Sequence, residues 1–286
     1  MPTSITALLR ELTPPLLWRG LIGLRSRFAG SPEWEYIPAG WAYATAHPEV
    51  TGWNVESVLQ IYRAKWPAFA AAAQSSRPLD FTHESPAFTG GDLNAHNAVM
   101  TFAYVLARAA QQRPSLSLLD WGGGSGHYYL LARTLYPDIR LDYHCRDLPL
   151  LAAYGAELFP DQSFSSDDSC LARRYDLVMA NGSLHYSQEW RGVLAGLAKA
   201  ATGFLYVGSF PLVADAPSFV FVQRPQAYGY GTEYLAWCLN RDEFLAECVR
   251  MGLTLLREFV YGYAPPIHAA PGQAEYRGFL FSASQE

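Results

Sequence analysis

A glycine-rich turn in the middle of the chain is the segment best suited to hold a ligand. An apolar stretch ends at Asp120 and Trp121, and glycines follow at alternate positions, as Gly122, Gly124 and Gly126. Because glycine has no Cβ, a ligand can lie directly against the main chain where a strand passes into a helix. The pattern therefore predicts a ligand-binding loop at the carboxyl end of a strand.

Three other glycine motifs fit this turn poorly. The dinucleotide fingerprint GxGxxG needs glycine where His127 stands, or where Tyr129 stands when it is counted from Gly124. A phosphate-binding P-loop ends in Gly-Lys-Ser or Gly-Lys-Thr, and a serine-hydrolase elbow centred on Ser125 needs a glycine in place of His127. Nicotinamide binding, phosphoryl transfer and serine hydrolysis are therefore disfavoured.

An acidic residue follows at the end of the next predicted strand. Asp147 comes after Cys145 and Arg146 and before Leu148. A carboxylate at this place can accept hydrogen bonds from both hydroxyls of a ribose. Asp142 is the rival acid, but it lies inside the predicted strand and is aimed away. The alternative interpretation is that Asp147 only caps the following helix, where Asp is favoured.

The order of the predicted elements places both segments at one edge of a sheet. After Pro114, strands and helices alternate, which is the pattern of a parallel sheet covered on both faces. The predicted strands are 117–121, 141–145, a short one near Ser163, 175–180, 204–210, 254–263 and 275–282. The predicted helices are 55–74, 94–111, 128–135, 148–157, 190–201 and 240–251. The sequence thus predicts an α/β, Rossmann-like sheet of seven strands, mostly parallel, with a C-terminal antiparallel hairpin.

The glycine loop, the Asp-Leu-Pro segment at 147–149 and this order of elements resemble class I S-adenosylmethionine-dependent methyltransferases over residues 92–282. With its aromatic and proline-rich upstream region, the chain more narrowly resembles methyltransferases often encoded with bacterial surface-polysaccharide synthesis genes. We therefore expect a methyltransferase domain at 92–286, preceded by a helical and aromatic extension at 1–91.

The resemblance implies S-adenosylmethionine as the cofactor. In such enzymes a polar turn after the third strand, here Ser166 and Asp167, lies beside the adenine, although an ordinary turn explains these residues equally well. The loop that begins at Asn181 borders the methionine portion and the acceptor, which Tyr186 is expected to contact. The residues expected to bind the cofactor are Asp120, Trp121, Gly122, Gly124, Gly126, Asp147, Leu148, Ser166, Asp167 and Asn181.

Methyl transfer to a hydroxyl needs a base to take the proton, whereas a carboxylate or phosphate acceptor needs none. His185, in the loop after the fourth strand, is the predicted base, and a histidine that only supports the loop is the alternative. His127 is a rival, with a helix-start residue near the cofactor carboxylate as its alternative interpretation, and His268 in the proline loop is a weaker rival. An aromatic insertion at 211–240 is predicted to cover the acceptor, with Arg224 holding an anionic sugar or phosphate, although such aromatic stripes are also explained by packing.

The composition of the chain limits which partners the protein is expected to bind. The 286 residues are 50% apolar and 16% charged with a net charge of −5, so no basic surplus favours nucleic acid. The four cysteines lack metal-ligand spacing, so no metal and a reducing cytoplasm are expected. No apolar run reaches the roughly 18 residues of a membrane span. A weakly basic helix within 5–28 either packs on the domain or makes weak contact with an anionic membrane.

Together these patterns predict S-adenosylmethionine-dependent methyl transfer, directed to an oxygen of a sugar, glycan precursor or other small metabolite. One alternative is a noncatalytic cofactor-binding module with the same fold. The other is an NAD-dependent sugar oxidoreductase or epimerase, which the displaced third glycine of the GxGxxG pattern disfavours.

Overall fold

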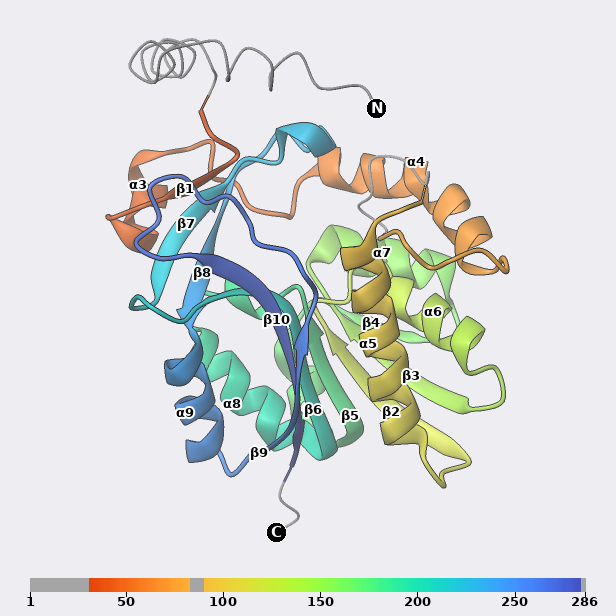
Figure 1. Ribbon diagram of the computed structural model, residues 1–286. Coiled ribbons are helices and arrows are strands. Elements are labelled where there is room, and N and C mark those ends of the chain that lie inside the picture. The colour runs from red at the N-terminus through yellow and green to blue at the C-terminus, as the bar shows by residue number, and fades with distance from the viewer. Residues whose placement is uncertain (1–30, 83–89, 284–286) are drawn as a thin grey trace, which may run out of the picture. The chain divides into compact units, whose positions relative to one another are not determined.

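The computed structural model describes residues 31–82 and 90–283 (Figure 1). One compact unit begins at Trp34 and contains the whole sheet. The domain boundary expected between residues 91 and 92 stays a prediction. The expected membrane contact through residues 5–28 lies outside the described residues.

Seven strands form the central sheet. They are β2 (Ser115–Trp121), β3 (Arg140–Arg146), β4 (Ser163–Ser165), β5 (Tyr175–Asn181), β6 (Ala201–Val213), β9 (Thr254–Val260) and β10 (Ala274–Ser282). Their order in the sheet is β4-β3-β2-β5-β6-β10-β9. The first five are parallel, while β10 runs antiparallel to both β6 and β9. The predicted mostly parallel sheet with a C-terminal antiparallel hairpin is therefore confirmed.

Helices cover both faces of this sheet, because successive strand residues point to opposite faces. Each of the six predicted helices is present within one residue at either end. They are α4 (Glu56–Ala73), α5 (Leu93–Ala110), α6 (His127–Leu135), α7 (Pro149–Leu158), α8 (Trp190–Ala200) and α9 (Arg241–Arg250). Leu118 packs with the apolar residues of α4, α5 and α6, whereas Leu119 packs with those of α8 and α9. Short helices are η1 (Gly40–Ala42), α3 (Tyr43–Ala46), η2 (Asp168–Ala172), η3 (Leu184–Tyr186) and η4 (Gln226–Tyr228).

Three further strands extend the sheet to ten and correct the interpretation of 211–240 as an insertion. They are β1 (Trp34–Tyr36), β7 (Phe219–Gln223) and β8 (Tyr234–Asn240). β8 pairs in parallel with the distal end of β6, where Leu212 lies beside Leu239, and β7 and β1 follow in antiparallel order. Phe219 and Phe221 lie in β7, and Tyr234 and Trp237 lie in β8. Figure 1 shows these strands continuing the sheet beyond β6.

A loop at residues 49–54 joins these additional strands to α7. Gly52 donates its backbone N–H to Glu233 O over 3.0 Å and accepts a 2.7 Å hydrogen bond from Thr232 Oγ1. Asn54 Oδ1 accepts the backbone N–H of Leu150 in the first turn of α7 over 3.2 Å. The loop is thereby held across the carboxyl ends of the central strands.

Candidate active site

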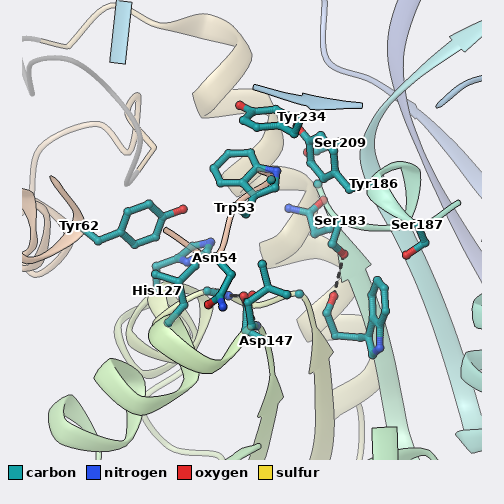
Figure 2. A pocket seen from close by; sticks show the side chains of 18 of the residues that line it. Trp53, Asn54, Tyr62, His127, Asp147, Ser183, Tyr186, Ser187, Ser209 and Tyr234 are labelled. Atoms are coloured by element: carbon teal, nitrogen blue, oxygen red, sulfur yellow. Dashed lines mark hydrogen bonds between the residues drawn. The ribbon is translucent and has the colours of Figure 1, made fainter. Parts of the chain in front are cut away.

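A cavity of about 580 Å³ lies at the carboxyl ends of β2, β3 and β5 (Figure 2). This volume is in the range of small-molecule sites. The ends of the parallel strands form one side, while the loop at 49–54, α4, α5 and the start of β8 form the others. The described lining is Trp41, Ala44, Val50, Thr51, Gly52, Trp53, Asn54, Tyr62, Phe69, Phe81, Thr82, Ala98, Val99, Trp121, Gly122, Gly124, His127, Tyr128, Leu131, Arg146, Asp147, Leu148, Leu151, Asn181, Gly182, Ser183, Tyr186, Ser187, Ser209, Tyr234 and Leu235.

The glycine loop opens directly onto this cavity. Gly122 has a φ of +77° and donates its N–H to Arg146 O over 2.7 Å. A Cβ on Gly122 would lie 2.2 Å from the Cβ of Ser183, whose Oγ donates to Trp121 O over 2.7 Å, as the dashed line in Figure 2 marks. Glycine is therefore required at 122 both by backbone angle and by space.

Asp147 ties the end of β3 to the glycine loop. Its Oδ2 accepts the backbone N–H of Gly124 and its Oδ1 accepts that of Leu148, each over 2.6 Å. Burial raises the pKa of this carboxyl, and the two backbone hydrogen bonds oppose that rise. Each oxygen has a second lone pair, so the carboxylate can still accept hydroxyl groups from the cavity that it lines.

Asp120 lies beneath the loop and does not contribute to the described lining. Tyr143 donates its hydroxyl to Asp120 Oδ2 over 2.7 Å, while Oδ1 has no hydrogen-bond partner among the described residues. Burial raises the pKa of this carboxyl to about 7. A Cβ on Gly123 would lie 2.4 Å from the carboxyl carbon, so Asp120 supports the loop from below.

Gly126 likewise acts through the backbone. It has a φ of +87° and turns the chain into α6, where a Cβ would come within 3.1 Å of the Phe159 ring. The described lining includes the neighbouring His127 but not Gly126. The structure thus brings together six of the ten expected cofactor residues, namely Trp121, Gly122, Gly124, Asp147, Leu148 and Asn181.

The turn after β4 does not reach the described lining. Ser166 and Asp167 are exposed, and Asp167 accepts the backbone N–H of Ser169 to cap η2. The next residue, Asp168, pairs instead with Arg146 over 2.8 Å. The Arg146 guanidinium also lies 5.0 Å from the centre of the Trp121 ring, and these two residues belong to the described lining.

His185 occupies a position different from that expected of a base. Its side chain is buried, does not belong to the described lining, and has neither ring nitrogen hydrogen-bonded to another described residue. Burial lowers the pKa of this imidazole to about 3. The ring packs 4.0 Å from that of Tyr186, so its observed contact with the cavity is indirect. Of the two rivals, His127 belongs to the described lining; the backbone of His268 pairs with β1, and its side chain is not among the lining residues described.

The loop after β5 faces the cavity as expected. Asn181 donates through Nδ2 to the hydroxyl of Tyr128, while its Oδ1 is buried without a hydrogen-bond partner in the described part of the chain. Tyr186 lines the cavity and donates its hydroxyl to Gln223 Oε1 over 3.2 Å. Asn181 and Tyr186 therefore line the same cavity as the glycine loop, and their contacts with cofactor and acceptor stay predictions.

Arg224 belongs to a second depression, whose described lining includes Glu49 and Glu233. Its guanidinium pairs with Glu35 over 2.7 Å and with Glu233 over 3.1 Å. Two carboxylates already oppose this charge, and the described lining of the main cavity does not include Arg224. The structure thus separates Arg224 from the expected acceptor site.

Trp53, which the sequence does not single out, forms another part of the wall together with two tyrosines. Trp53 stacks on Tyr234 with ring centres 4.4 Å apart and meets Tyr186 edge to face at 5.4 Å. Trp53 lies in an irregular loop, and its partners come from β8 and η3. Its position depends on the contacts of that loop with Thr232 and Glu233, for which the sequence carries no periodic signal.

Comparison with solved structures identifies the fold. A proposed sarcosine dimethylglycine methyltransferase from Galdieria sulphuraria is similar with a TM-score of 0.50 and 14% identity, over 79% of this chain and 98% of that chain. The CurJ carbon methyltransferase gives 0.46 and 15%, over 85% and 70% of the two chains. The 1,6-didemethyltoxoflavin-N1-methyltransferase of Burkholderia thailandensis, solved with S-adenosylhomocysteine, gives 0.44 and 15%, over 66% and 79%. The similarity to the first of these structures confirms that this chain has the Rossmann-like fold of methyltransferases. No family model and no curated protein sequence matches the chain.

Two further findings concern residues 31–82 and 90–283 alone. In these ranges no helix combines the length and apolar character that crossing a membrane requires. The same ranges hold no group of three or more His, Cys, Asp or Glu side chains arranged to bind a metal ion. All four cysteines are buried free thiols.

Proposed function

We propose that this protein binds S-adenosylmethionine at the glycine loop and transfers its methyl group to a small-molecule acceptor in the same cavity. One observation carries the proposal: Gly122, Gly124 and Asp147, which come from two neighbouring strand ends, line a single cavity. Bare backbone beside a carboxylate suits an adenosyl group, because the ribose hydroxyls donate to the acid and the ligand lies against the glycines. The methyltransferase fold supports this assignment.

In such a reaction, one set of residues holds the cofactor and another encloses the acceptor. When bound, S-adenosylmethionine supplies a methyl carbon to an acceptor lone pair, the carbon–sulfur electron pair stays on sulfur, and the acceptor proton leaves to a base or to water. Trp121, Asp147 and Leu148 hold the cofactor side, while Trp53, Tyr186 and Tyr234 enclose the acceptor and exclude water. Holding the two reactants together in this way accounts for much of the acceleration in such reactions.

We keep oxygen as the proposed acceptor atom, because the Asp-Leu-Pro segment at 147–149 resembles that of several small-molecule O-methyltransferases. If the acceptor is a hydroxyl, His127 is the better candidate for the base, because it lines the cavity and His185 does not belong to the described lining. The resemblance to methyltransferases encoded with polysaccharide synthesis genes adds a sugar or glycan precursor as one candidate acceptor.

Calorimetry tests the cofactor directly. The protein is titrated with S-adenosylmethionine, S-adenosylhomocysteine and NAD⁺, and we expect binding of both adenosyl compounds and none of NAD⁺. Absence of heat with the adenosyl compounds contradicts the proposal. Turnover is then measured as release of S-adenosylhomocysteine with a panel of hydroxylated acceptors. Binding without release for every acceptor favours the noncatalytic module.

A further inference from the structure

The end of the cavity around Trp53 is suited to bind a planar ring. The Trp53 indole is stacked at 25° to the ring of Tyr234, and the rings of Tyr186 and Tyr230 meet it at 66° and 61°. Figure 2 shows Trp53, Tyr186 and Tyr234 gathered toward one end, away from Asp147. Aromatic walls of this kind favour planar ligands through stacked and edge-to-face contacts.

Two hydrogen-bond donors among the tryptophans that line the cavity have no hydrogen-bond partner in the described part of the chain. The indole nitrogens Nε1 of Trp53 and of Trp41 are buried, and neither has a hydrogen-bond partner among the residues that the structure describes. Both indoles line the cavity. An indole N–H can only donate, and a buried indole usually finds an acceptor. A bound molecule with oxygen or ring-nitrogen atoms would supply hydrogen-bond acceptors for these two N–H groups.

The distribution of charge limits what such a molecule can carry. Within the described lining, Arg146 and Asp147 are the only Asp, Glu, Lys or Arg side chains. Both are at the end of β3, on the cofactor side, and Asp168 already opposes the charge of Arg146 at 2.8 Å. Arg224 is held by Glu35 and Glu233 in the second depression. An anionic group beside Trp53 would have no cationic partner from the described lining, which is unfavourable wherever the group is removed from water.

We propose that the acceptor is an uncharged molecule with a flat ring, whose oxygen or ring-nitrogen atoms accept hydrogen bonds from the indoles of Trp53 and Trp41. This inference rests on the proposed methyl transfer and narrows its acceptor class. It replaces a sugar linked to a nucleotide or lipid phosphate, because the phosphates of such a molecule need cations that the described residues around Trp53 do not offer.

Matched probes test the charge requirement without turnover. The protein, saturated with S-adenosylhomocysteine at about pH 6.5, is titrated with 7-hydroxycoumarin and 4-hydroxybenzamide. Their carboxylate counterparts, 7-hydroxycoumarin-3-carboxylate and 4-hydroxybenzoate, are titrated in parallel, together with UDP-glucose. We expect at least one neutral probe to bind about tenfold or more tightly than its carboxylate partner and than UDP-glucose. If the carboxylates or UDP-glucose bind equally well, or if neither neutral probe binds, the inference is wrong.

Substitution of the indoles tests the hydrogen bonds. Trp53→Phe and Trp41→Phe keep an aromatic ring but remove the N–H, and we expect each to weaken binding of the better neutral probe about fivefold to tenfold. Trp66→Phe, on α4 and outside the described lining, is the matched control and should leave that affinity unchanged. Affinity for S-adenosylhomocysteine and the melting temperature show that each variant is folded. Unchanged probe affinity in both folded variants overturns the assignment of the donors.

The same measurements separate this inference from the function on which it rests. If S-adenosylhomocysteine fails to bind, the proposed methyl transfer fails. If S-adenosylhomocysteine binds and the neutral probes do not, only the acceptor class is wrong.

Discussion

The backbone amide of Gly124 donates a hydrogen bond to Oδ2 of Asp147 over 2.6 Å. This contact joins the loop after β2 to the end of β3, and both residues line the main cavity. The carboxylate that is suited to a ribose therefore also fixes the backbone on which the ligand lies. Loss of its charge should affect the ligand and the loop together.

Asp147→Asn tests this double role. An amide has one acceptor oxygen, so its NH₂ group faces either the Gly124 or the Leu148 N–H as a second donor. We expect the affinity for S-adenosylhomocysteine to fall about tenfold or more in calorimetry. Asp142→Asn is the control, because Asp142 is an exposed residue of β3, the strand that precedes Asp147, and pairs with Arg173. Equal affinities in the two variants would contradict the assignment of Asp147.

Gly122→Ala tests the need for bare backbone. The new Cβ would lie 2.2 Å from the Cβ of Ser183, at a φ of +77° that side chains disfavour. We expect a loss of unfolding free energy of at least about 2 kcal/mol, together with weaker binding of S-adenosylhomocysteine. Gly192→Ala is the matched control in α8, where nothing described lies within 4 Å of an added Cβ. It should stabilise the protein by about 0.5–1 kcal/mol in thermal melts. A Gly122→Ala variant as stable as the wild type would show that the loop can rearrange.

Asp120→Asn tests the buried acid beneath the loop. The pKa of Asp120 is about 7 in the folded protein against an ordinary value of 3.8, so the folded state holds the proton to higher pH. Its contribution to stability is full below pH 4 and is lost as the pH rises through 7, by about 4 kcal/mol at most. The variant should match the wild type near pH 4 and be more stable at pH 8 in chemical denaturation. The exposed Asp161→Asn serves as the control, and the idea fails if the two variants show the same pH profile.

His185→Phe tests whether this histidine acts as a base. With a pKa of about 3 when folded against an ordinary value of 6.5, the buried imidazole contributes stability that is present above pH 6.5 and is lost as the pH falls toward 3. The wild type should therefore lose about 2 kcal/mol from this group between pH 7 and pH 5, and the variant should not. S-adenosylhomocysteine affinity should be retained. If the variant binds the product normally but releases none in turnover, the predicted base role is supported instead.

The residues that could be predicted from sequence are those whose role is local. Gly122 and Gly124 follow an apolar strand and are followed by a helix, so their position at a strand end can be inferred from neighbours in the chain. The same argument predicts that Asp147 lies at the end of the next strand. The strand periodicity that predicts the sheet also predicts which face each strand residue covers, as Leu118 and Leu119 show.

The missed residues depend on contacts between distant segments. Trp53 lies in a loop without periodicity and meets Tyr234, which is 181 positions further on, only because β8 pairs with the end of β6. The run at 219–222 is uniformly apolar, a pattern that fits a strand buried on both faces as well as a packed insertion. The prediction for His185 rests on its place in a loop, but the direction of its ring depends on η3, a single short turn.

The pairing of β8 with the end of β6 has one more consequence. Because Leu212 and Leu239 lie side by side in that pairing, the strand that carries Tyr234 is hydrogen-bonded to the same sheet that carries Asn181. That part of the cavity wall therefore belongs to the sheet itself and is not a movable lid. The loop at 49–54, whose described ties to it are a few hydrogen bonds such as that from Thr232, is where substitutions can change the choice of acceptor while leaving the framework intact.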